Sequence, residues 1–328
     1  MIQLDHIDVT FQQKKRQIQA VKDVTIHINE GDIYGIVGYS GAGKSTLVRV
    51  INLLQVPSAG TIIVDGDVIY QDQVTLKPAA LREKRRDIGM IFQDPLSALN
   101  PLMRIEDQIK EGLSYHTKMN AEQRQARALE LLEQVGIPNP ARVGRQYPHE
   151  LSGGMRQRVI IAIAIACKPP IVIADEPTTA LDVTIQAQIL DLLKDLQEET
   201  KTGIILITHD LGVVAEMADR VAVMYGGQFV EVAGVKELFD HPKHPYTRSL
   251  LNSIPQEGHH DAELHVIEGV VPSLKNMPRK GCRFAPRIPW IPASDHEEDP
   301  ILHEVAPNHL VRCSCYKHFH FRDEKGEV

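Results

Sequence analysis

A glycine-rich segment at residues 38–45 has the residue types and spacing to bind phosphate groups. Its sequence, GYSGAGKS, fits the P-loop pattern, in which backbone N–H groups turn inward around phosphate oxygens. Lys44 would neutralise the β- and γ-phosphates, and the Ser45 hydroxyl would ligate Mg²⁺. The other phosphate-binding groups are expected on Gly38, Ser40, Gly41, Gly43 and Thr46. A glycine turn matching this pattern by chance is disfavoured, because the segment follows a predicted strand and precedes a predicted helix.

Two acids follow an apolar strand predicted at residues 171–174. Asp175 would lie near the Mg²⁺ if this strand is adjacent to the strand that enters the glycine loop. Glu176, one residue beyond the strand end, could polarise an attacking water as general base. A strand followed by two acids is common, so this interpretation depends on the P-loop upstream. Together, the two motifs predict hydrolysis of a nucleoside triphosphate.

Residues 151–157, LSGGMRQ, form a second candidate anion site. The Ser152 hydroxyl and the amides of Gly153 and Gly154 lie just before a predicted helix, whose N-terminus adds positive potential. Taken alone, a Ser-Gly-Gly sequence is a weak signal.

The elements that must position these residues are those of an α/β fold. Residues 1 to about 75 are β-rich, with a short buried strand at 33–37 and a helix predicted at 47–54. Further apolar strands at 171–174 and 204–207 have helices between them, which predicts a mostly parallel core sheet. An amphipathic helix at 122–135 belongs to a helical insertion at about 96–160.

The composition changes near residue 241, where proline and histidine become frequent. We predict a main domain at residues 1–240, with the helical subdomain at about 96–160, and a small C-terminal extension at 241–328. The segment 255–328 shows little periodicity. Its residues are expected to pack as an appendage on the main domain.

Bulk composition excludes several classes of protein. The net charge of -7 disfavours a nucleic-acid binder, whose surface is usually basic. The longest apolar run, residues 159–167, is far shorter than the roughly 20 residues of a bilayer span. The first residues lack the pattern of a signal peptide, and four cysteines are too few for a disulfide scaffold. We expect a cytosolic chain that reaches a membrane only through a partner.

The motifs and their order resemble those of ABC transporter ATPases. Residues 151–157 are similar to the ABC signature, with Met155 in place of the commoner glutamine. Gln93 resembles the Q-loop glutamine, residues 180–182 resemble the D-loop, and His209 resembles the switch histidine. A kinase that uses a P-loop would explain neither the signature nor His209.

This resemblance implies a P-loop NTPase fold and a site shared by two ATPase domains paired head to tail. Each ATP would lie between the P-loop of one domain and the signature of the other. The implied catalytic residues are Glu176, His209, Gln93 and Lys44, and the implied Mg²⁺ ligands are Ser45, Gln93 and Asp175. Ser152, Gly153 and Gly154 would bind the partner's ATP, and Asp182 would contact the partner domain. Phe11 stands where the family places an aromatic residue against adenine, although an isolated phenylalanine is more often a core residue.

Two kinds of importer are resembled in different parts of the chain. Residues 92–101, 147–158, 174–183 and 244–247 resemble oligopeptide/dipeptide importer ATPases, whereas about the first 90 residues are more similar to methionine importer ATPases. Because the later segments determine docking, we expect an ATPase that powers peptide import. Methionine or another small nutrient is the alternative, and a soluble, non-transport ABC ATPase is disfavoured because no tandem domain or coiled coil is present.

The implied partners are those of a bacterial-type importer. They are a second ABC ATPase, expected to be a different chain, two transmembrane permease subunits and an extracytoplasmic peptide-binding protein. No nucleic acid is expected. The resemblance implies a peripheral location on the cytoplasmic face of a prokaryotic cell membrane, with ATP and Mg²⁺ as ligands.

The C-terminal cysteines leave three alternatives open. In many peptide importer ATPases, four cysteines of this extension ligate an iron–sulfur cluster, but here Ile288 replaces one of them. Cys282, Cys313 and Cys315 remain, and the incomplete set disfavours a cluster. A zinc site that adds His303, His309, His318 or His320 is the second alternative. Free thiols in a packed appendage are the favoured interpretation.

Overall fold

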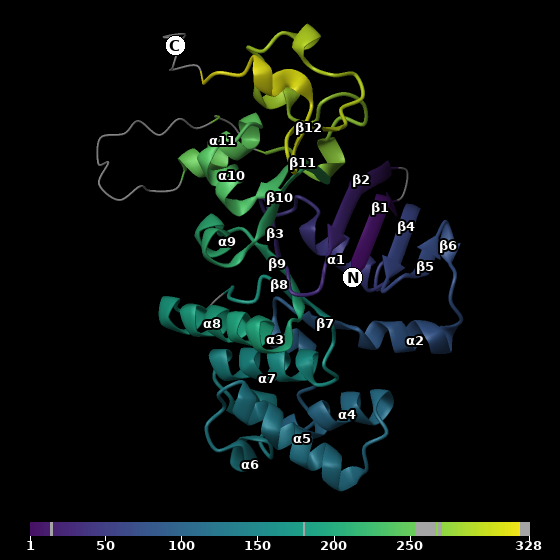
Figure 1. Ribbon diagram of the computed structural model, residues 1–328, viewed down its shortest axis with the longest axis vertical. Coiled ribbons are helices and arrows are strands. Elements are labelled where there is room, and N and C mark those ends of the chain that lie inside the picture. Colours follow the sequence, from purple (N-terminus) through teal and green to yellow (C-terminus); the bar gives the residue numbers. More distant parts are fainter. Residues whose placement is uncertain (14–15, 180, 254–266, 268–270, 322–328) are drawn as a thin grey trace. The chain divides into compact units, whose positions relative to one another are not determined.

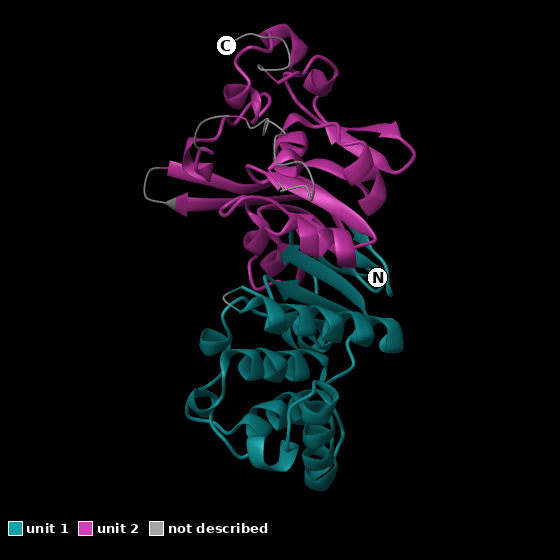
Figure 2. Ribbon diagram, turned by 90° about the vertical axis from the view of Figure 1, so that its left-hand side faces the viewer, with its two compact units in different colours: residues 1–3, 27–33, 62–207 teal, residues 4–26, 34–61, 208–328 magenta. Residues whose placement is uncertain are grey.

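The computed structural model describes residues 1–328 except 14–15, 180, 254–266, 268–270 and 322–328 (Figure 1). The described chain divides into two compact units (Figure 2). Unit 1 comprises residues 1–3, 27–33 and 62–207, and unit 2 comprises residues 4–26, 34–61 and 208–328. These units cut across the predicted boundary at residue 240, so the division into 1–240 and 241–328 stays a prediction.

Unit 1 contains a parallel sheet and most of the helices. Strand β8 pairs in parallel with β7 on one side and with β9 on the other. Every residue of β8 is buried, as expected for a central parallel strand. The elements of this part of the chain are β5 (Asp67–Gln71), β6 (Gln73–Val74), α2 (Pro78–Arg86), β7 (Ile88–Ile91), α3 (Pro95–Ala98), α4 (Ile105–His116), α5 (Ala121–Gln134), α6 (Pro140–Val143), η1 (Pro148–Glu150), α7 (Gly153–Ile165), β8 (Ile171–Asp175), α8 (Val183–Thr200) and β9 (Gly203–Thr208).

The helical insertion is present in unit 1, and its main helix is where the apolar spacing predicts it. Helix α5 starts after Asn120, whose side chain forms a capping box with Gln123. Its buried residues are Ala128, Leu131 and Leu132, and the helix packs against α4 and α7 (Figure 1). The amphipathic pattern at 122–135 is therefore confirmed to within one residue at each end.

Unit 2 contains the glycine loop and the C-terminal part of the chain. Strand β3 pairs in parallel with β10, and β11, β13 and β12 continue from β10 with antiparallel pairing. The parallel pair β3–β10 is thus extended by antiparallel strands, of which β12 and β13 come from the C-terminal segment. The elements of this part are β1 (Ile2–Gln13), β2 (Arg16–Ile28), β3 (Ile33–Val37), α1 (Lys44–Ile51), β4 (Ala59–Val64), α9 (Leu211–Met217), β10 (Arg220–Tyr225), β11 (Gln228–Gly234), α10 (Val235–Asp240), α11 (Pro245–Asn252), η2 (Leu274–Asn276), η3 (Ala285–Arg287), η4 (Ala293–Asp295), β12 (Leu302–Ala306), β13 (His309–Arg312) and η5 (Ser314–Lys317).

Two sequence predictions differ from the observed elements. Helix α1 begins at Lys44, directly after the glycine loop, and ends at Ile51, so the predicted range 47–54 is wrong in its bounds. Two residues beyond the end of the helix, Leu53 has a positive φ of 49°. The strands β12 and β13 lie in a segment where little periodicity was visible. Among the described residues, no helix combines the length and apolar character needed to cross a bilayer.

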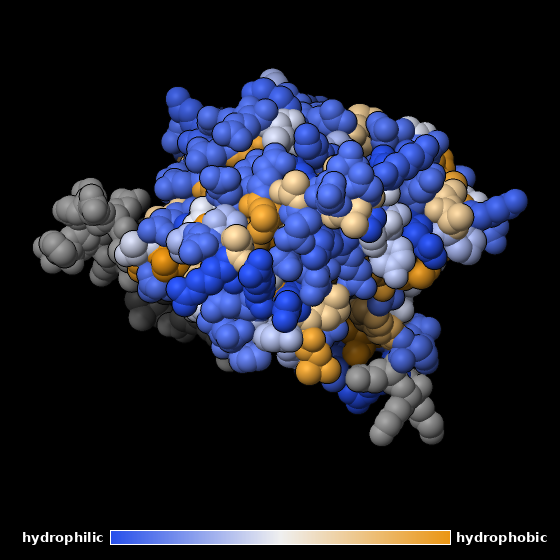
Figure 3. Space-filling view, turned by 90° about the horizontal axis from the view of Figure 1, so that it is seen from below, coloured by the Kyte–Doolittle hydropathy of each residue, from blue (hydrophilic) through white to orange (hydrophobic). Residues whose placement is uncertain are grey.

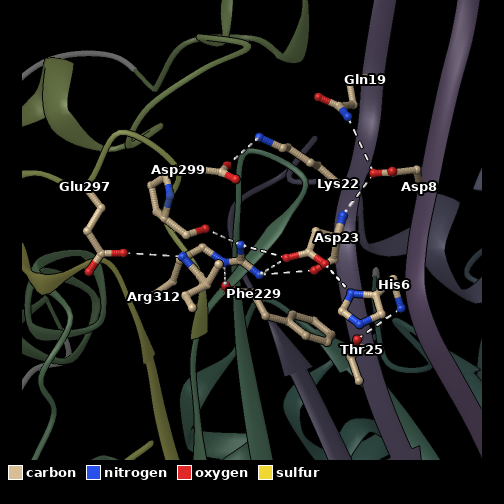
Figure 4. A network of polar contacts seen from close by, with 12 residues as sticks. His6, Asp8, Gln19, Lys22, Asp23, Thr25, Phe229, Glu297, Asp299 and Arg312 are labelled. Carbon is tan, nitrogen blue, oxygen red and sulfur yellow. Dashed lines mark hydrogen bonds and ion pairs between the residues drawn. The ribbon is translucent and has the colours of Figure 1, made fainter. Parts of the chain in front are cut away.

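A buried arginine holds the C-terminal segment against β2 (Figure 4). The Arg312 guanidinium donates hydrogen bonds to the carbonyl oxygens of Phe229 (2.8 Å) and Pro300 (2.8 Å). It also donates to the Asp23 carboxylate at 3.2 Å and to the Asp23 carbonyl at 3.1 Å. Asp23 in turn contacts His6 Nδ1 at 2.8 Å. Because each donor of this buried cation has a partner, the network fixes β13 to the N-terminal strands of unit 2.

A second buried ion pair holds the β12–β13 hairpin to β11. His309 Nε2 lies 2.7 Å from Glu231 Oε1, and both side chains have an exposed fraction of 0%. The hydrogen bond to Glu231 raises the pKa of His309 above its ordinary value. Glu231 also accepts hydrogen bonds from the backbone N–H groups of Lys243 and His244. One carboxylate thus joins β11, the hairpin and the segment that enters α11.

We expect His309→Gln to lower the free energy of unfolding by about 2 kcal/mol at pH 6, the value of a hydrogen bond to a charged group. Because the folded-state pKa of His309 is raised, its contribution is complete below about pH 6.5 and is lost as the pH rises through the raised value. The deficit should therefore shrink between pH 6 and pH 9 in denaturant titrations. His303→Gln, which alters the separate and more exposed pair with Glu297, is the matched control. An equal deficit at both pH values would contradict the charged pair.

Candidate functional site

The glycine loop joins the buried strand β3 to helix α1 in unit 2. Gly41 and Gly43 have φ values of 86° and 106°, a region that favours glycine. A Cβ at Gly43 would lie 2.5 Å from the Ala20 carbonyl oxygen, and a Cβ at Gly38 would clash with the Met224 carbonyl oxygen. These glycines therefore let the backbone turn tightly at the N-terminus of α1, as a phosphate-binding loop requires.

Lys44 directs its ammonium group into this loop. Its Nζ donates hydrogen bonds to the carbonyl oxygens of Gly38 (2.6 Å) and Tyr39 (3.1 Å), and the residue is only 4% exposed. A buried ammonium needs such partners. Phosphate oxygens would be stronger acceptors than these carbonyls, so the arrangement suits the phosphate-binding role predicted for Lys44.

The glycine loop is backed by aromatic side chains of β10 and of the C-terminal segment, a contact that the sequence did not reveal. Tyr246 Oη accepts a hydrogen bond from the Tyr39 backbone N–H at 3.1 Å. The Tyr225 ring lies 5.4 Å from the ring of Tyr39 and 4.8 Å from that of Tyr246, and Phe284 lies 4.9 Å from Tyr225. Burial raises the pKa of Tyr39 to about 12, so its hydroxyl stays neutral. The only sequence signal was the HPYT segment at 244–247, whose resemblance to peptide importers did not indicate this contact.

His244 positions Tyr246 in this cluster. Burial lowers the pKa of His244 to about 4, so its imidazole is neutral. Its Nδ1 accepts a hydrogen bond from the Tyr246 backbone N–H at 3.1 Å, and the backbone N–H of His244 donates to the Glu231 carboxylate at 2.9 Å. The start of α11 is thereby fixed, and with it the hydroxyl that contacts the glycine loop.

We expect Tyr246→Phe to raise the KM for ATP two- to tenfold, because one net hydrogen bond contributes about 0.5–1.5 kcal/mol. The Tyr39 amide would lose its acceptor while the ring packing remains. Steady-state ATPase kinetics on the variant and the unchanged chain provide the measurement. Tyr225→Phe is the matched control, since it removes a hydroxyl of the same cluster that forms no hydrogen bond with the described glycine loop. Similar KM values in all three proteins would contradict the predicted role.

The second group of predicted residues lies in unit 1, at the carboxyl end of β8. Asp175 is the last residue of the strand and is 4% exposed. Glu176 follows with a positive φ of 47°, and its N–H donates to the Ile207 carbonyl at 2.9 Å. Its carboxylate accepts hydrogen bonds from Gln93 Nε2 (3.0 Å) and from the Thr179 hydroxyl (2.9 Å). The structure thus joins two predicted catalytic residues, Gln93 and Glu176, and adds Thr179, which the sequence analysis did not name.

The signature and D-loop residues form two helix N-termini in unit 1. Ser152 caps α7, and its hydroxyl accepts a hydrogen bond from the Met155 N–H at 3.3 Å. Gly154 packs so closely that an added Cβ would lie 2.8 Å from the Ile185 side chain. Asp182 caps α8 and accepts from the Ile185 N–H at 3.0 Å. Ala180 of the predicted D-loop lies outside the described residues. The N-termini of α7 and α8 both present backbone N–H groups, the donors expected of anion-binding helix ends.

His209 and Phe11 lie in unit 2 with the glycine loop. His209 follows β9 and is exposed, and its neighbour Asp210 caps α9 by accepting hydrogen bonds from Gly212 and Val213. Phe11, on β1, has an exposed fraction of 37%, so it is not a core residue. The placement of both side chains at the surface leaves them accessible to a ligand.

The candidate Mg²⁺ ligands are suited to that ion by their chemistry. Ser45 in unit 2 offers a hydroxyl, while Gln93 and Asp175 in unit 1 offer an amide and a carboxylate oxygen. Magnesium prefers oxygen ligands and few carboxylates when phosphate oxygens are also available. The predicted set meets both conditions.

The C-terminal cysteines are brought together in unit 2, with a histidine that the sequence analysis missed. One ligand atom from each of Cys282, Cys313, Cys315 and His296 lies within 4.8 Å of the others. The histidines named from the sequence are not in this group. His303 contacts Glu297 at 2.8 Å and His309 contacts Glu231, so carboxylates already engage both rings. The zinc alternative named other histidines, whereas the histidine that lies among the three cysteines is His296.

Two family models match separate parts of the chain. The ABC transporter family model matches residues 21–179, and the model for the oligopeptide/dipeptide transporter C-terminal region matches residues 230–290. An oligopeptide transport ATP-binding protein of Lactococcus lactis subsp. cremoris is 48% identical over 99% of this chain and 97% of its own length. That of Bacillus subtilis is 47% identical over 95% of this chain and 88% of its own length. Both matches include most of the first 90 residues.

A solved structure has the same fold. The ATP-binding cassette MJ0796, in a dimeric post-hydrolysis state bound to ADP and Pi, superposes with a TM-score of 0.65 at 34% identity. It covers 72% of this chain and 99% of its own chain. The rest of this chain has no counterpart in that cassette. A separate family model matches residues 230–290. The chain therefore belongs to the ATP-binding subunits of the ABC transporter family.

Proposed function

We propose that this chain hydrolyses ATP to power the import of oligopeptides through a membrane ABC transporter. The Glu176 carboxylate, held by Gln93 and Thr179 at the end of a buried strand, is the observation that supports hydrolysis. The match of residues 230–290 to the peptide-transporter C-terminal region, and the full-length peptide-transporter relatives, support the substrate class.

In the proposed mechanism, the chain's own residues bind the triphosphate and move one proton. Lys44 and the amides of the glycine loop bind the phosphates, while Phe11 packs against adenine. Ser45, Asp175 and Gln93 would hold Mg²⁺, which supplies neutralising charge to the phosphate oxygens. Glu176 accepts a proton from the attacking water, and His209 contacts the γ-phosphate.

We further propose that the site is completed by a second ATPase chain. Ser152, Gly153 and Gly154 would bind the ATP held by the partner's P-loop, and Asp182 would contact the partner. We propose that this partner is a different ATPase chain. Alone, this chain should bind ATP but hydrolyse it slowly, because half of the composite site is missing.

The proposed membrane partners are two permease subunits, supplied by an extracytoplasmic peptide-binding protein. Next to Gln93, the helical region exposes Phe92 (37%), Leu96 (57%) and Leu102 (86%), an apolar set that a short cytoplasmic helix of a permease could cover. Elsewhere, the face shown in Figure 3 is mostly hydrophilic, with apolar side chains in scattered groups. We further propose a peripheral location at the cytoplasmic face of a prokaryotic membrane, with no nucleic acid among the partners.

Uptake by the reconstituted complex tests the proposal. The chain would be purified with its permease and ATPase partners, placed in proteoliposomes with the binding protein, and given labelled oligopeptide. We expect ATP-dependent peptide uptake that excess unlabelled methionine does not compete. Competition by methionine, with no peptide uptake, would instead favour the small-nutrient alternative.

A further inference from the structure

We propose that Cys282, His296, Cys313 and Cys315 bind a single Zn²⁺ ion that organises the C-terminal segment. The four ligands come from different parts of unit 2. Cys282 precedes η3, His296 follows η4, and Cys313 and Cys315 lie at the end of β13 and in η5. The proposal does not depend on the transported solute.

The size of the cluster fits one tetrahedral ion. With Zn–S bonds of about 2.3 Å, the thiolates of a tetrahedral site lie about 3.8 Å apart. The ligand atoms here all lie within 4.8 Å of one another, although the structure contains no ion. Only a small inward movement would close the site. Three cysteines and one histidine form one of the usual structural zinc sets, and they leave no coordination position open for catalysis.

The same geometry argues against an iron–sulfur cluster. A cluster of several irons and sulfides must fit between its cysteine ligands and holds them further apart than one ion does. Its usual ligands are four thiolates, whereas this chain places Ile288 at one expected position and offers an imidazole as the fourth ligand. The departure from the peptide-importer pattern thus changes the metal that the site favours.

The surroundings have the features of a prepared site. Cys282, Cys313 and Cys315 are buried, with exposed fractions of 8%, 1% and 0%. His296 Nδ1 is a buried nitrogen without a hydrogen-bond partner in the described part of the chain, which is costly unless something binds the ring. The Glu297 backbone N–H donates to Cys313, as hydrogen bonds around metal thiolates commonly do.

Backbone strain at Cys313 supports the same conclusion. Cys313 has φ 69° and ψ 139°, a conformation that non-glycine residues rarely adopt. Its neighbour Arg312 is fixed by Asp23, Phe229 and Pro300, so the chain must turn sharply to bring Cys313 to the cluster. A metal–thiolate bond would offset the cost of this turn.

The site is also connected to the glycine loop. Cys282 is two residues from Phe284, whose ring contacts Tyr225 and Tyr246 at 4.9 and 5.8 Å. Tyr246 in turn accepts the hydrogen bond from Tyr39. An ion that fixes Cys282 would therefore stabilise the aromatic wall behind the P-loop.

Metal analysis of the full-length chain tests the proposal. The chain would be expressed in medium containing both zinc and iron, purified under reducing conditions and analysed by mass spectrometry of the elements. We expect about one zinc and no stoichiometric iron per chain. Replacement by Co²⁺ should produce the visible bands of tetrahedral thiolate coordination, and a chelator should lower the melting temperature.

Matched variants assign the ligands. Cys315→Ser and His296→Ala should each lose the zinc, whereas His296→Cys should keep it, because four thiolates also bind zinc. Cys167→Ser, at a cysteine outside the cluster, and His303→Gln should leave the metal content unchanged. Stoichiometric iron with acid-labile sulfide would overturn the proposal. Failure of the reduced chain to take up zinc, a disulfide among the three cysteines, or zinc that persists in both ligand variants would equally overturn it.

Discussion

Glu176→Gln is expected to lower the kcat for ATP hydrolysis by about 1,000-fold, within the range that positioned general bases contribute. The substitution keeps the size of the side chain and one acceptor oxygen, so Gln93 and Thr179 can still hold it. It removes the negative charge that would accept a proton from water. Because Glu176 is not predicted to bind the phosphates, ATP should still bind.

ATPase assays of the assembled complex, together with nucleotide binding to the purified chain, provide the measurement. Thr179→Val is a useful comparison, since it removes one hydrogen bond to the carboxylate and leaves the base in place. It should lower kcat far less than Glu176→Gln. If Glu176→Gln kept more than a tenth of the activity, another group would have to be the base.

The sequence was sufficient for these residues because their chemistry is local. A P-loop is a short stretch of backbone, and its glycines, lysine and serine are contiguous at residues 38–45. Likewise, Glu176 is the residue directly after a strand, and the end of the apolar run in the sequence marks where that strand ends. The resemblance to ABC ATPases identified Gln93, but its hydrogen bond to Glu176 is seen only in the structure.

Residues that work through tertiary contacts were harder to predict. Tyr246 meets the glycine loop only because His244 and Glu231 fix the start of α11, and no spacing in the sequence indicates that contact. His296 is surrounded by short 3₁₀ turns without periodicity, so nothing marked it among the 15 histidines of the chain. Strand β12 is only partly buried along its length, which weakens the alternation that predicts strands.

Lys44→Ala is expected to weaken ATP binding about 10- to 100-fold, because a hydrogen bond to a charged group contributes about 1.5–3 kcal/mol. The glycine loop encloses the Lys44 ammonium group, which donates hydrogen bonds to the backbone carbonyls of Gly38 and Tyr39. Hydrolysis should also be lost, since the developing charge on the phosphates would lack its nearest cation. Lys194→Ala, on the exposed face of α8, controls for a general loss of positive charge.

Thermal unfolding with and without ATP separates binding from folding. Without nucleotide, Lys44→Ala leaves the Gly38 and Tyr39 carbonyls without the ammonium, so a modest fall in melting temperature is expected. Saturating ATP should stabilise the unchanged chain by an amount that grows with ligand concentration over Kd, and that increase should nearly disappear in Lys44→Ala. If the variant kept the full ATP-induced stabilisation but lost hydrolysis, Lys44 would act on the transition state alone. The loop amides and the N-terminus of α1 would then account for the binding of the ground-state nucleotide.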